Sequence, residues 1–430
     1  MTTPAPTLLS LATTINTLTQ AIIIKLTMHN VPEPTFTSST DHPLWQDPTL
    51  DLNTTKARLV DAATSLTRLV AGPLTFHREV FGSHFDLAAL QVMLEHRVYD
   101  QIPLGGGCMT LSELGERVRL DPAKLARMLR LLATLNIAEE VEDGVFRHTA
   151  FSEVLVRDRE LRAQVEMQRD GRLDEMHKAS VETANYFKEY PAAEESHLSP
   201  FKYRWGTPFY EWYEKNPEKG VRFALAQEGI AKLDRSSAAL VEWIKTSGHP
   251  EGRLIDVGGG SGHVALELAK QFPTWSFTVQ DISETMFSEN SQCADPSLLS
   301  RVEFSQHDFF QPQRVVPEDV KAWYIRSCLH NWGDDDCVRV LRQFAPALEA
   351  RPECSVLINE SIVPARGTVP LREEHLVRQV DVAMMVIANS KQRSEQDFRD
   401  LILKADRRYE VVRVIRLPGT MGVIEFKLRK

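Results

Sequence analysis

The chain has 430 residues, of which 43% are hydrophobic and 25% are charged, and its formal net charge is −9 at pH 7. This length allows two or three domains with cores of their own, and the acidic balance argues against nucleic-acid binding, which depends on neutralising phosphates. The five cysteines are scattered without metal-ligand spacing, so we expect no metal site and a reducing, cytoplasmic compartment.

Residues 1–84 are expected to hold two helices and a linker. Apolar residues recur at helical spacing over 7–29 and 57–70, and the segment between them is rich in Pro, Ser, Thr and Asp. Lys25 interrupts the apolar part of the first helix, so neither a signal peptide nor a membrane span is expected. Neither helix can bury its apolar face alone, so both are expected to pack on a partner or on the rest of the chain.

Residues 85–157 have the element order of a winged helix, with three helices followed by a hairpin. Thr110 and Glu113 have the spacing of a capping box at the second helix, and Pro122 opens the third. In a transcription factor the third helix would present basic residues to DNA: Lys124, Arg127 and Arg130. Most of that helix is apolar and the chain is acidic, so DNA binding is the weaker alternative.

Residues 158–200 are polar and predict a helical connector, and residues 201–430 predict an α/β domain. Short apolar runs alternate with helical patterns in this domain, which is typical of a parallel sheet. The expected strands are 254–257, 276–280, 301–306, 321–325, 355–359, 409–416 and 423–428. Because the last two form a hairpin-like pair, one strand of the seven is expected to run antiparallel to the others.

The most informative segment is a glycine-rich turn between the first of these strands and a helix. Gly258, Gly259 and Gly260 follow the apolar strand directly, so the backbone can lie against a ligand there. Asp256 stands two residues before the turn, where a carboxylate would repel a pyrophosphate but would tolerate a sulfonium or an ammonium group. The segment therefore favours S-adenosylmethionine as the cofactor.

Polar and aromatic residues also follow the next strands, at the edge where open α/β sheets bind ligands. Asp281 is placed to accept both ribose hydroxyls of an adenosine cofactor. Asp308 can accept the adenine amino group, and Phe309 can cover the face of the ring. The fourth strand leads into Arg326 and then His330. Four concordant strand ends in succession predict one binding site.

From residue 201 onward the chain resembles the plant and fungal O-methyltransferases of the caffeate type, and residues 207–227 resemble their fungal secondary-metabolism branch. The motifs that carry the resemblance are Asp256–Gly262, His307–Phe309, Leu329–Trp332 with Asp334–Asp336, and Asn359–Pro364. The resemblance implies a Rossmann-like methyltransferase domain with a mostly parallel sheet, preceded by an α-helical winged-helix dimerisation domain. It also implies a homodimer intertwined through the N-terminal helices, while charge and composition predict no membrane or nucleic-acid partner.

The same resemblance implies roles for individual residues. His330 matches the general base of the family, and Glu360 matches an acid that holds the second imidazole nitrogen. Arg326 corresponds to a family lysine near the adenine, which Trp332 would flank. Gln392 replaces the second acid of the family. Glutamine can hydrogen-bond the imidazole but cannot stabilise its protonated form by charge, so the pKa of His330 is expected to be lower than in relatives.

The expected acceptor is a phenolic or enolic hydroxyl, because its pKa of about 10 or below lets a neutral imidazole remove its proton. Apolar residues indicate a flat pocket for an aromatic or polyketide-type metabolite: Trp205, Phe209, Trp212, Met384, Met385 and Ile387. Gln227 stands where the family often has a pocket methionine.

Two alternative functions stay open. Some fungal relatives bind S-adenosylmethionine and catalyse cyclisations or pericyclic rearrangements without methylating, but those relatives tend to lose the base histidine. The presence of His330 therefore favours methylation, while Gln392 leaves room for the other chemistry. A regulator that binds DNA through the winged helix is supported by fold analogy alone.

Overall fold

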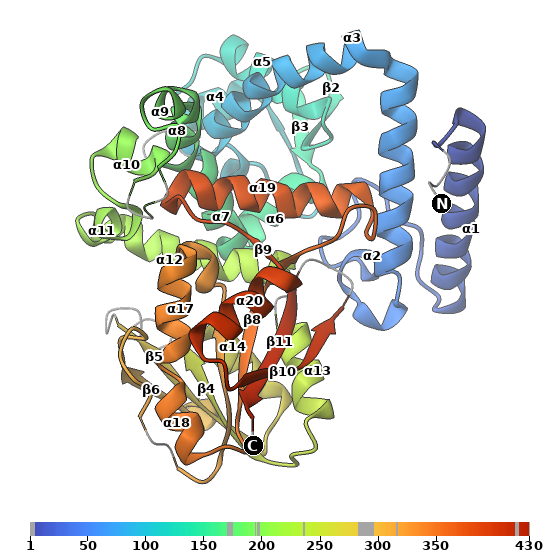
Figure 1. Cartoon of the computed structure of the whole chain (residues 1–430). Coiled ribbons are helices and arrows are strands. Elements are labelled where there is room, and N and C mark those ends of the chain that lie inside the picture. Colours follow the sequence, from blue (N-terminus) through green and yellow to red (C-terminus); the bar gives the residue numbers. More distant parts are fainter. Residues whose placement is uncertain are drawn as a thin grey trace. The chain divides into compact units, whose positions relative to one another are not determined.

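The chain folds into two compact units (Figure 1). Unit 1 comprises Met1–Glu175 with Pro370–Arg372, and unit 2 comprises Met176–Val369 with Glu373–Lys430. The computed structural model describes residues 5–169, 175–193, 195, 198–234, 237–282, 296–314, 317–417 and 421–429.

Unit 1 is helical with a small sheet of order β1-β3-β2. Its elements are α1 (Leu8–Met28), α2 (Pro43–Gln46), α3 (Asn53–Glu95), β1 (Cys108–Thr110), α4 (Leu111–Val118), α5 (Pro122–Ala133), β2 (Ala138–Glu142), β3 (Val145–His148), α6 (Ala150–Arg157) and α7 (Arg159–Arg169). α1 lies along α3 (Figure 1) and buries Ile22 and Leu26 against Leu50 and Leu52. Within the described residues, α1 is the one helix that is long and apolar enough to cross a membrane, judged by length and composition alone.

α3 joins segments that the sequence pattern separated. Gly72 has a non-helical φ of 74° and Pro73 follows it, so two helical segments of α3 meet at a kink here. Proline is tolerated because it occupies the first turn of the second segment, where an N–H would have no helical partner. α3 consequently runs through residue 84, where the pattern placed a domain boundary, as far as Glu95.

The expected winged helix is present. The Thr110 hydroxyl oxygen accepts the Glu113 N–H at 3.2 Å, and the Glu113 carboxylate accepts the Thr110 N–H at 3.0 Å, which confirms the capping box of α4. On α5, Arg130 pairs with Glu140 and with Asp143 of the hairpin at 2.7 Å each. A charge that a DNA-binding domain would turn toward phosphates is therefore neutralised within the unit.

Unit 2 is a doubly wound α/β structure. Its helices are α8 (Glu175–Val181), α9 (Thr183–Glu189), α10 (Pro200–Trp205), α11 (Phe209–Glu214), α12 (Pro217–Asp234), α13 (Ala238–Thr246), α14 (His263–Gln271), α16 (Pro296–Leu299), α17 (Asp334–Arg342), α18 (Ala345–Ala350), α19 (Leu371–Ala388) and α20 (Glu395–Ala405). Its strands are β4 (Gly252–Val257), β5 (Trp275–Asp281), β6 (Val302–Gln306), β7 (Val320–Arg326), β8 (Ser355–Val363), β9 (Arg393–Ser394), β10 (Tyr409–Arg416) and β11 (Met421–Leu428).

The strand order in the described part of unit 2 is β10-β11-β8-β7-β4-β5-β6, with β9 paired to the end of β8. β11 runs antiparallel to both of its neighbours, whereas β4 to β8 pair in parallel. This confirms the predicted sheet with one antiparallel strand. β8 continues past its predicted end at residue 359, because the buried Glu360 and Ser361 are polar residues that a hydrophobicity pattern reads as a strand end.

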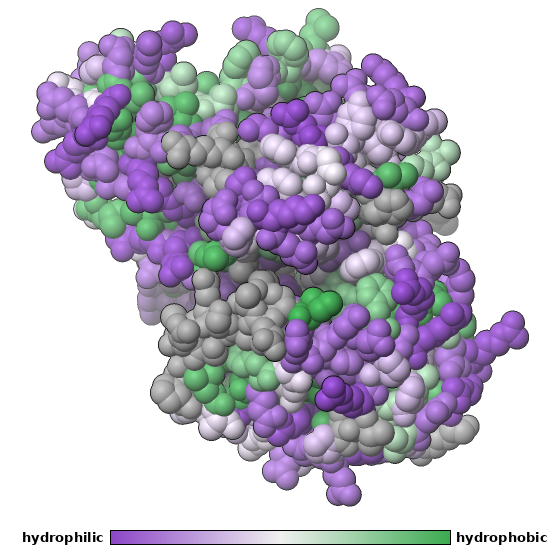
Figure 2. All heavy atoms as spheres, turned by 90° about the vertical axis from the view of Figure 1, so that its left-hand side faces the viewer, coloured by the Kyte–Doolittle hydropathy of each residue, from purple (hydrophilic) through white to green (hydrophobic). Residues whose placement is uncertain are grey.

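Helices cover both faces of this sheet. Trp323 and Ile325 of β7 pack with α17, α18 and α20, while Ala322 and Tyr324 pack on the other face with α13 and α14. Burial on both faces explains why the strands read as apolar runs, and the carboxyl ends of β4 to β8 meet at one edge. The surface seen in Figure 2 is mostly hydrophilic, with hydrophobic side chains in small separate patches.

Leu129 is fully buried in the core that α3, α4 and α5 share. Replacing Leu129 with Ala should lower the free energy of unfolding by about 2–5 kcal/mol, because it removes apolar contacts and leaves a cavity. Leu135, which is 45% exposed just beyond α5, is the matched control, and its replacement by Ala should cost less than about 1 kcal/mol. Urea denaturation followed by circular dichroism measures both, and equal losses would contradict the burial of Leu129.

Candidate active site

The glycine-rich turn after β4 is held over the end of β5 by its backbone. The N–H groups of Gly258 and Gly259 donate to the Gln280 carbonyl at 2.8 and 3.0 Å, and the Gly260 N–H donates to an Asp281 carboxylate oxygen at 3.0 Å. Gly258 and Gly260 have φ values of 72° and 55°, which favour glycine. The structure therefore brings the turn and Asp281 together.

No side chain fits on two glycines of the turn. A Cβ on Gly258 would lie 2.8 Å from the Cys328 sulfur, and one on Gly259 would lie 2.5 Å from the Asp256 carboxyl carbon. Asp256 is 2% exposed, lies opposite Tyr324 in the register of β4 and β7, and has a pKa raised to about 7 by burial. Because Asp256 falls on a buried face of β4, its carboxylate lies beneath the turn.

Aromatic side chains gather at the ends of β6 and β7, beside the turn. Phe309 lies 3.4 Å from the position of a Gly258 Cβ. The Trp332 ring meets Phe309 edge-on at 6.1 Å and Phe310 at 4.9 Å between centroids. One carboxylate oxygen of Asp308 accepts the Phe310 N–H at 2.9 Å. An adenine ring at this edge would find both a carboxylate acceptor and an apolar face.

Arg326 ends β7 next to the same turn. Its Nε is buried without a hydrogen-bond partner among the described residues, and the same is true of His263 Nε2 at the start of α14. Burial, and then the charge of Arg326, lower the pKa of His263 to about 3, so this imidazole is neutral. These two buried polar atoms without partners lie beside a glycine turn that has no room for a side chain. Such a site fits a ligand with several polar groups, and S-adenosylmethionine is such a ligand.

His330 stands on a short 3-10 turn that follows β7. Ser327, which precedes the turn, has a φ of 48°, a value that costs a residue with a side chain about 1 kcal/mol or more. The buried Glu360 carboxylate offsets this cost. One of its oxygens accepts the N–H groups of Cys328 at 2.9 Å, Leu329 at 2.8 Å and His330 at 3.4 Å. Glu360 thus caps the turn, a contact that the sequence did not reveal.

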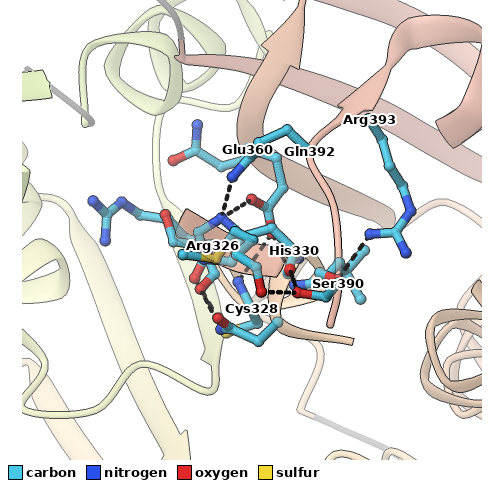
Figure 3. Close-up of polar contacts among 12 residues, drawn as sticks. Arg326, Cys328, His330, Glu360, Ser390, Gln392 and Arg393 are labelled. Carbon is cyan, nitrogen blue, oxygen red and sulfur yellow. Dashed lines mark hydrogen bonds and ion pairs between the residues drawn. The ribbon is translucent and has the colours of Figure 1, made fainter. Parts of the chain in front are cut away.

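The His330 imidazole is held between two side chains (Figure 3). Its Nδ1 lies 2.9 Å from the Gln392 side-chain nitrogen and 3.4 Å from the second Glu360 oxygen. That Glu360 oxygen and Gln392 Oε1 are both buried without a hydrogen-bond partner in the described part of the chain. If the Gln392 amide is turned so that its oxygen faces the imidazole, an N–H on Nδ1 of His330 can donate to that oxygen or to Glu360. Nε2 then keeps the lone pair that a base needs.

Burial, aided by two arginines, keeps the His330 imidazole neutral. Burial lowers the pKa of His330, Glu360 opposes this effect, and Arg326 and Arg393 add to it. The side chain is 17% exposed, so solvent screens these charges only partly. Arg393, on β9, was not singled out from the sequence, because a two-residue strand has no periodicity to detect.

The apolar residues expected to line a pocket all belong to one hydrophobic cluster. Three of them are buried inside it: Phe209, Trp212 and Ile387. Three are only partly buried and can face a ligand: Trp205, Met384 and Met385. Ser199 ties α10 to α19 by donating to the Ile387 carbonyl at 2.9 Å. The expected pocket residues are thus brought together, but half of them serve the core.

Tyr210 on α11 is a site residue that the sequence pattern did not single out. The residue is 43% exposed, yet the pKa of its phenol is raised by burial and then by three groups of the site, Cys328, Asp281 and Glu360. The Tyr210 phenol is therefore coupled electrostatically to groups of the site. Gln227, on α12, is half-buried. In the described residues, no group of three or more His, Cys, Asp or Glu side chains is placed to hold a metal ion.

Comparison with known proteins assigns both parts of the chain. Residues 186–407 match the family model of the O-methyltransferase domain, and residues 79–158 match that of the O-methyltransferase dimerisation domain. The chain is 36% identical to O-methyltransferase sol2 of Alternaria solani, over 99% of this chain and 96% of that protein. It is 29% identical to the chlorophenol O-methyltransferase of Trichoderma longibrachiatum, over 97% and 89% of the two chains.

Solved structures share the fold. OxaC in complex with SAH and oxaline superposes with a TM-score of 0.74 at 21% identity, over 97% of this chain and 100% of that one. A structure described as a pericyclic reaction enzyme superposes with a TM-score of 0.73 at 16% identity, over 96% and 100% of the two chains. The fold therefore occurs in a pericyclic reaction enzyme as well as in methyltransferases, while the two relatives compared by sequence are both O-methyltransferases. The chain belongs to the family of O-methyltransferases that use S-adenosylmethionine and have their own dimerisation domain.

Proposed function

We propose that this protein methylates a phenolic or enolic hydroxyl of an aromatic or polyketide-type metabolite, with His330 as the general base. The observation that carries the proposal is the neutral His330 imidazole, held at Nδ1 by Gln392 and Glu360 on the edge of the glycine turn. The relative from Trichoderma longibrachiatum is named for a chlorophenol, which is an acceptor of this class. The partly exposed Trp205 and Met385 suit a flat apolar acceptor.

The residues of the site divide the work. S-adenosylmethionine, when bound, supplies an electrophilic methyl group. The residues that would hold it are those of the glycine turn with Asp281, Asp308, Phe309, Arg326 and Trp332. Nε2 of His330 takes the proton of the acceptor hydroxyl, so that the oxygen becomes the nucleophile. The imidazolium that results is stabilised by the Glu360 carboxylate 3.4 Å from Nδ1. The protein need only orient the acceptor oxygen and remove its proton.

A non-methylating cyclase is the second candidate function. The observation that favours it is Gln392, which leaves the imidazole with one carboxylate, together with the fold that this chain shares with a pericyclic reaction enzyme. His330 argues for methylation, since a pericyclic rearrangement needs no base to deprotonate an acceptor. A winged-helix regulator is the weakest candidate, because Arg130 is paired with acids of its own unit.

We further propose that the protein is a cytoplasmic homodimer. The family model over residues 79–158 describes a dimerisation domain. α3 carries large apolar side chains that are exposed in the single chain: Leu69, Val70, Leu74, Val80, Phe81 and Phe85. A second copy would bury them. The four cysteines in the described residues are free thiols, in keeping with a reducing compartment.

Replacing His330 with Gln should reduce methyl transfer by about a hundredfold or more, because the acceptor proton loses its base. Affinity for S-adenosylmethionine should be unchanged in calorimetry, since the cofactor residues stay in place. The assay follows labelled methyl transfer to a panel of polyphenols. His249, an exposed histidine before β4, is the control, and its replacement by Gln should leave turnover intact. Wild-type turnover in the His330 variant would refute the base assignment. Cofactor binding by the native protein without transfer to any acceptor would favour the cyclase.

Replacing Gln392 with Glu should raise the pKa of His330, because a carboxylate 2.9 Å from Nδ1 favours the imidazolium. The base works only when neutral, so the acid limb of the kcat/KM profile should move to higher pH. Gln396 on the surface of α20 bonds to Asp400, and its replacement by Glu is the control that should leave the limb in place. A limb that stays put in the Gln392 variant would mean that His330 is not the titrating group.

Replacing Phe81 and Phe85 together with Asp should convert a dimer to a monomer in sedimentation velocity, because charges would enter an apolar interface. These residues are 75% and 59% exposed in the single chain. Val412 on β10, which is 51% exposed, is the control, and its replacement by Asp should leave the dimer intact. A native protein that sediments as a monomer at micromolar concentration would refute the homodimer, and a dimer that survives both changes would refute this interface.

A further inference from the structure

We infer that Arg393 is a positioning residue for methyl transfer: it holds the turn that carries His330 by donating hydrogen bonds to backbone carbonyls of that turn. The inference rests on the proposed role of His330 as the base. Arg393 makes up half of the two-residue strand β9 and pairs in register with Ile362 near the end of β8. Its side chain is 0% exposed, which is unusual for an arginine and needs a local cause.

The guanidinium of Arg393 spreads its donors over the turn (Figure 3). Nη1 donates to the Leu329 carbonyl at 2.9 Å, and Nη2 donates to the Trp332 carbonyl at 2.8 Å. Nε and Nη2 also donate to one carboxylate oxygen of Asp334 at 3.0 and 2.8 Å. The two carbonyls belong to residues that bracket His330 in the chain. Arg393 therefore fixes the backbone on both sides of the base.

A neighbouring contact acts in the same sense. The Ser390 hydroxyl donates to the His330 carbonyl at 2.6 Å, and Gln392 contacts the imidazole itself. The segment around β9 thus touches the turn at three residues: Ser390 and Arg393 donate to its carbonyl groups, and Gln392 contacts the imidazole. Glu360 holds the N–H side of the same turn. The turn is clamped between an anion at its N–H groups and a cation at its carbonyls, which is the arrangement that the backbone dipoles favour.

Burying Arg393 is unfavourable unless its donors are all used, because a buried charge loses its hydration. Asp334 is its counterion, and the Asp334 side chain is 44% exposed, so the pair is only half removed from water. A lysine could supply the same charge, but it lacks the planar fork that reaches two carbonyls and a carboxylate at once. The geometry points to orientation of the turn as the task of this residue.

Arg393 also belongs to the set of charges that face His330. Glu360 on β8 favours the imidazolium, whereas Arg326 on β7 and Arg393 on β9 disfavour it. Asp334 at the start of α17 partly cancels Arg393. Burial raises the pKa of the Cys328 thiol, two residues before His330, and that of the Tyr210 phenol, so both stay neutral. Loss of the Arg393 charge should therefore raise the pKa of His330.

The test compares Arg393→Met with Arg393→Lys in the full-length protein. Arg393→Met should lower kcat by about ten- to a hundredfold, because the base is misplaced, and should move the acid limb of kcat/KM to higher pH. Arg393→Lys should lower kcat but leave the limb in place, because the charge remains. Calorimetry with S-adenosylmethionine gives the Kd of each variant, and kcat is compared at saturating cofactor, so that a change at Trp332 is separated from misplacement of the base. Arg399→Met, which removes an exposed ion pair with Glu395 on α20, is the control and should behave as native.

Asp334→Asn provides a second readout of opposite sign. The substitution leaves the Arg393 charge without its counterion, so the pKa of His330 should fall and the acid limb should move to lower pH. Because the Asp334 side chain is 44% exposed, the variant should still fold. A folded Arg393→Met protein with native kcat and pH profile would overturn the inference. If that variant does not fold, an unmoved limb in Asp334→Asn together with native kcat in Arg393→Lys would overturn it. Native methyl transfer by His330→Gln would instead refute the role of His330 as the base, on which this inference rests.

Discussion

The buried Glu360 carboxylate is the group on which the site depends. It is 1% exposed and accepts N–H groups from the turn that carries His330. A carboxylate buried without donors would cost several kcal/mol, and a turn entered through the left-handed Ser327 is unfavourable by itself. The strained turn gives the buried carboxylate its N–H donors, and the carboxylate in turn stabilises the strained turn by accepting them at one oxygen. The geometry of the base is therefore set by the end of a neighbouring strand.

The sheet register determines how firmly this geometry is held. β7 and β8 pair in parallel up to Arg326 and Asn359, so the residue after Asn359 lies beside the turn that leaves β7. β9 adds to β8 at Ile362, which brings Arg393 to the other side of the same turn. Opposite charges thus reach the turn from two paired strands rather than from mobile loops. A site built on strands in this way keeps its side chains in place without a ligand.

The sequence predicts the parts of the structure that local chemistry specifies. The glycine turn and the Thr110 cap were predicted because each is encoded within a few residues. The burial of the Asp256 carboxylate was not predicted, because it follows from strand alternation and from the sheet register, which no motif announces. Arg393 was missed, because its burial depends on carbonyls about sixty residues earlier in the chain. The features that could not be predicted depend on tertiary contacts between segments that are far apart in the sequence.

Gln392 sets the kind of acceptor that the site suits. An amide at Nδ1 holds the imidazole by a hydrogen bond but adds no negative charge, so the imidazolium has one carboxylate, Glu360, against the cations Arg326 and Arg393. A lower pKa keeps more of the base neutral but makes it a weaker proton acceptor. A weaker base can still deprotonate an acidic hydroxyl and loses most toward an alcohol. The charges around His330 therefore fit a phenol or an enol better than an aliphatic alcohol.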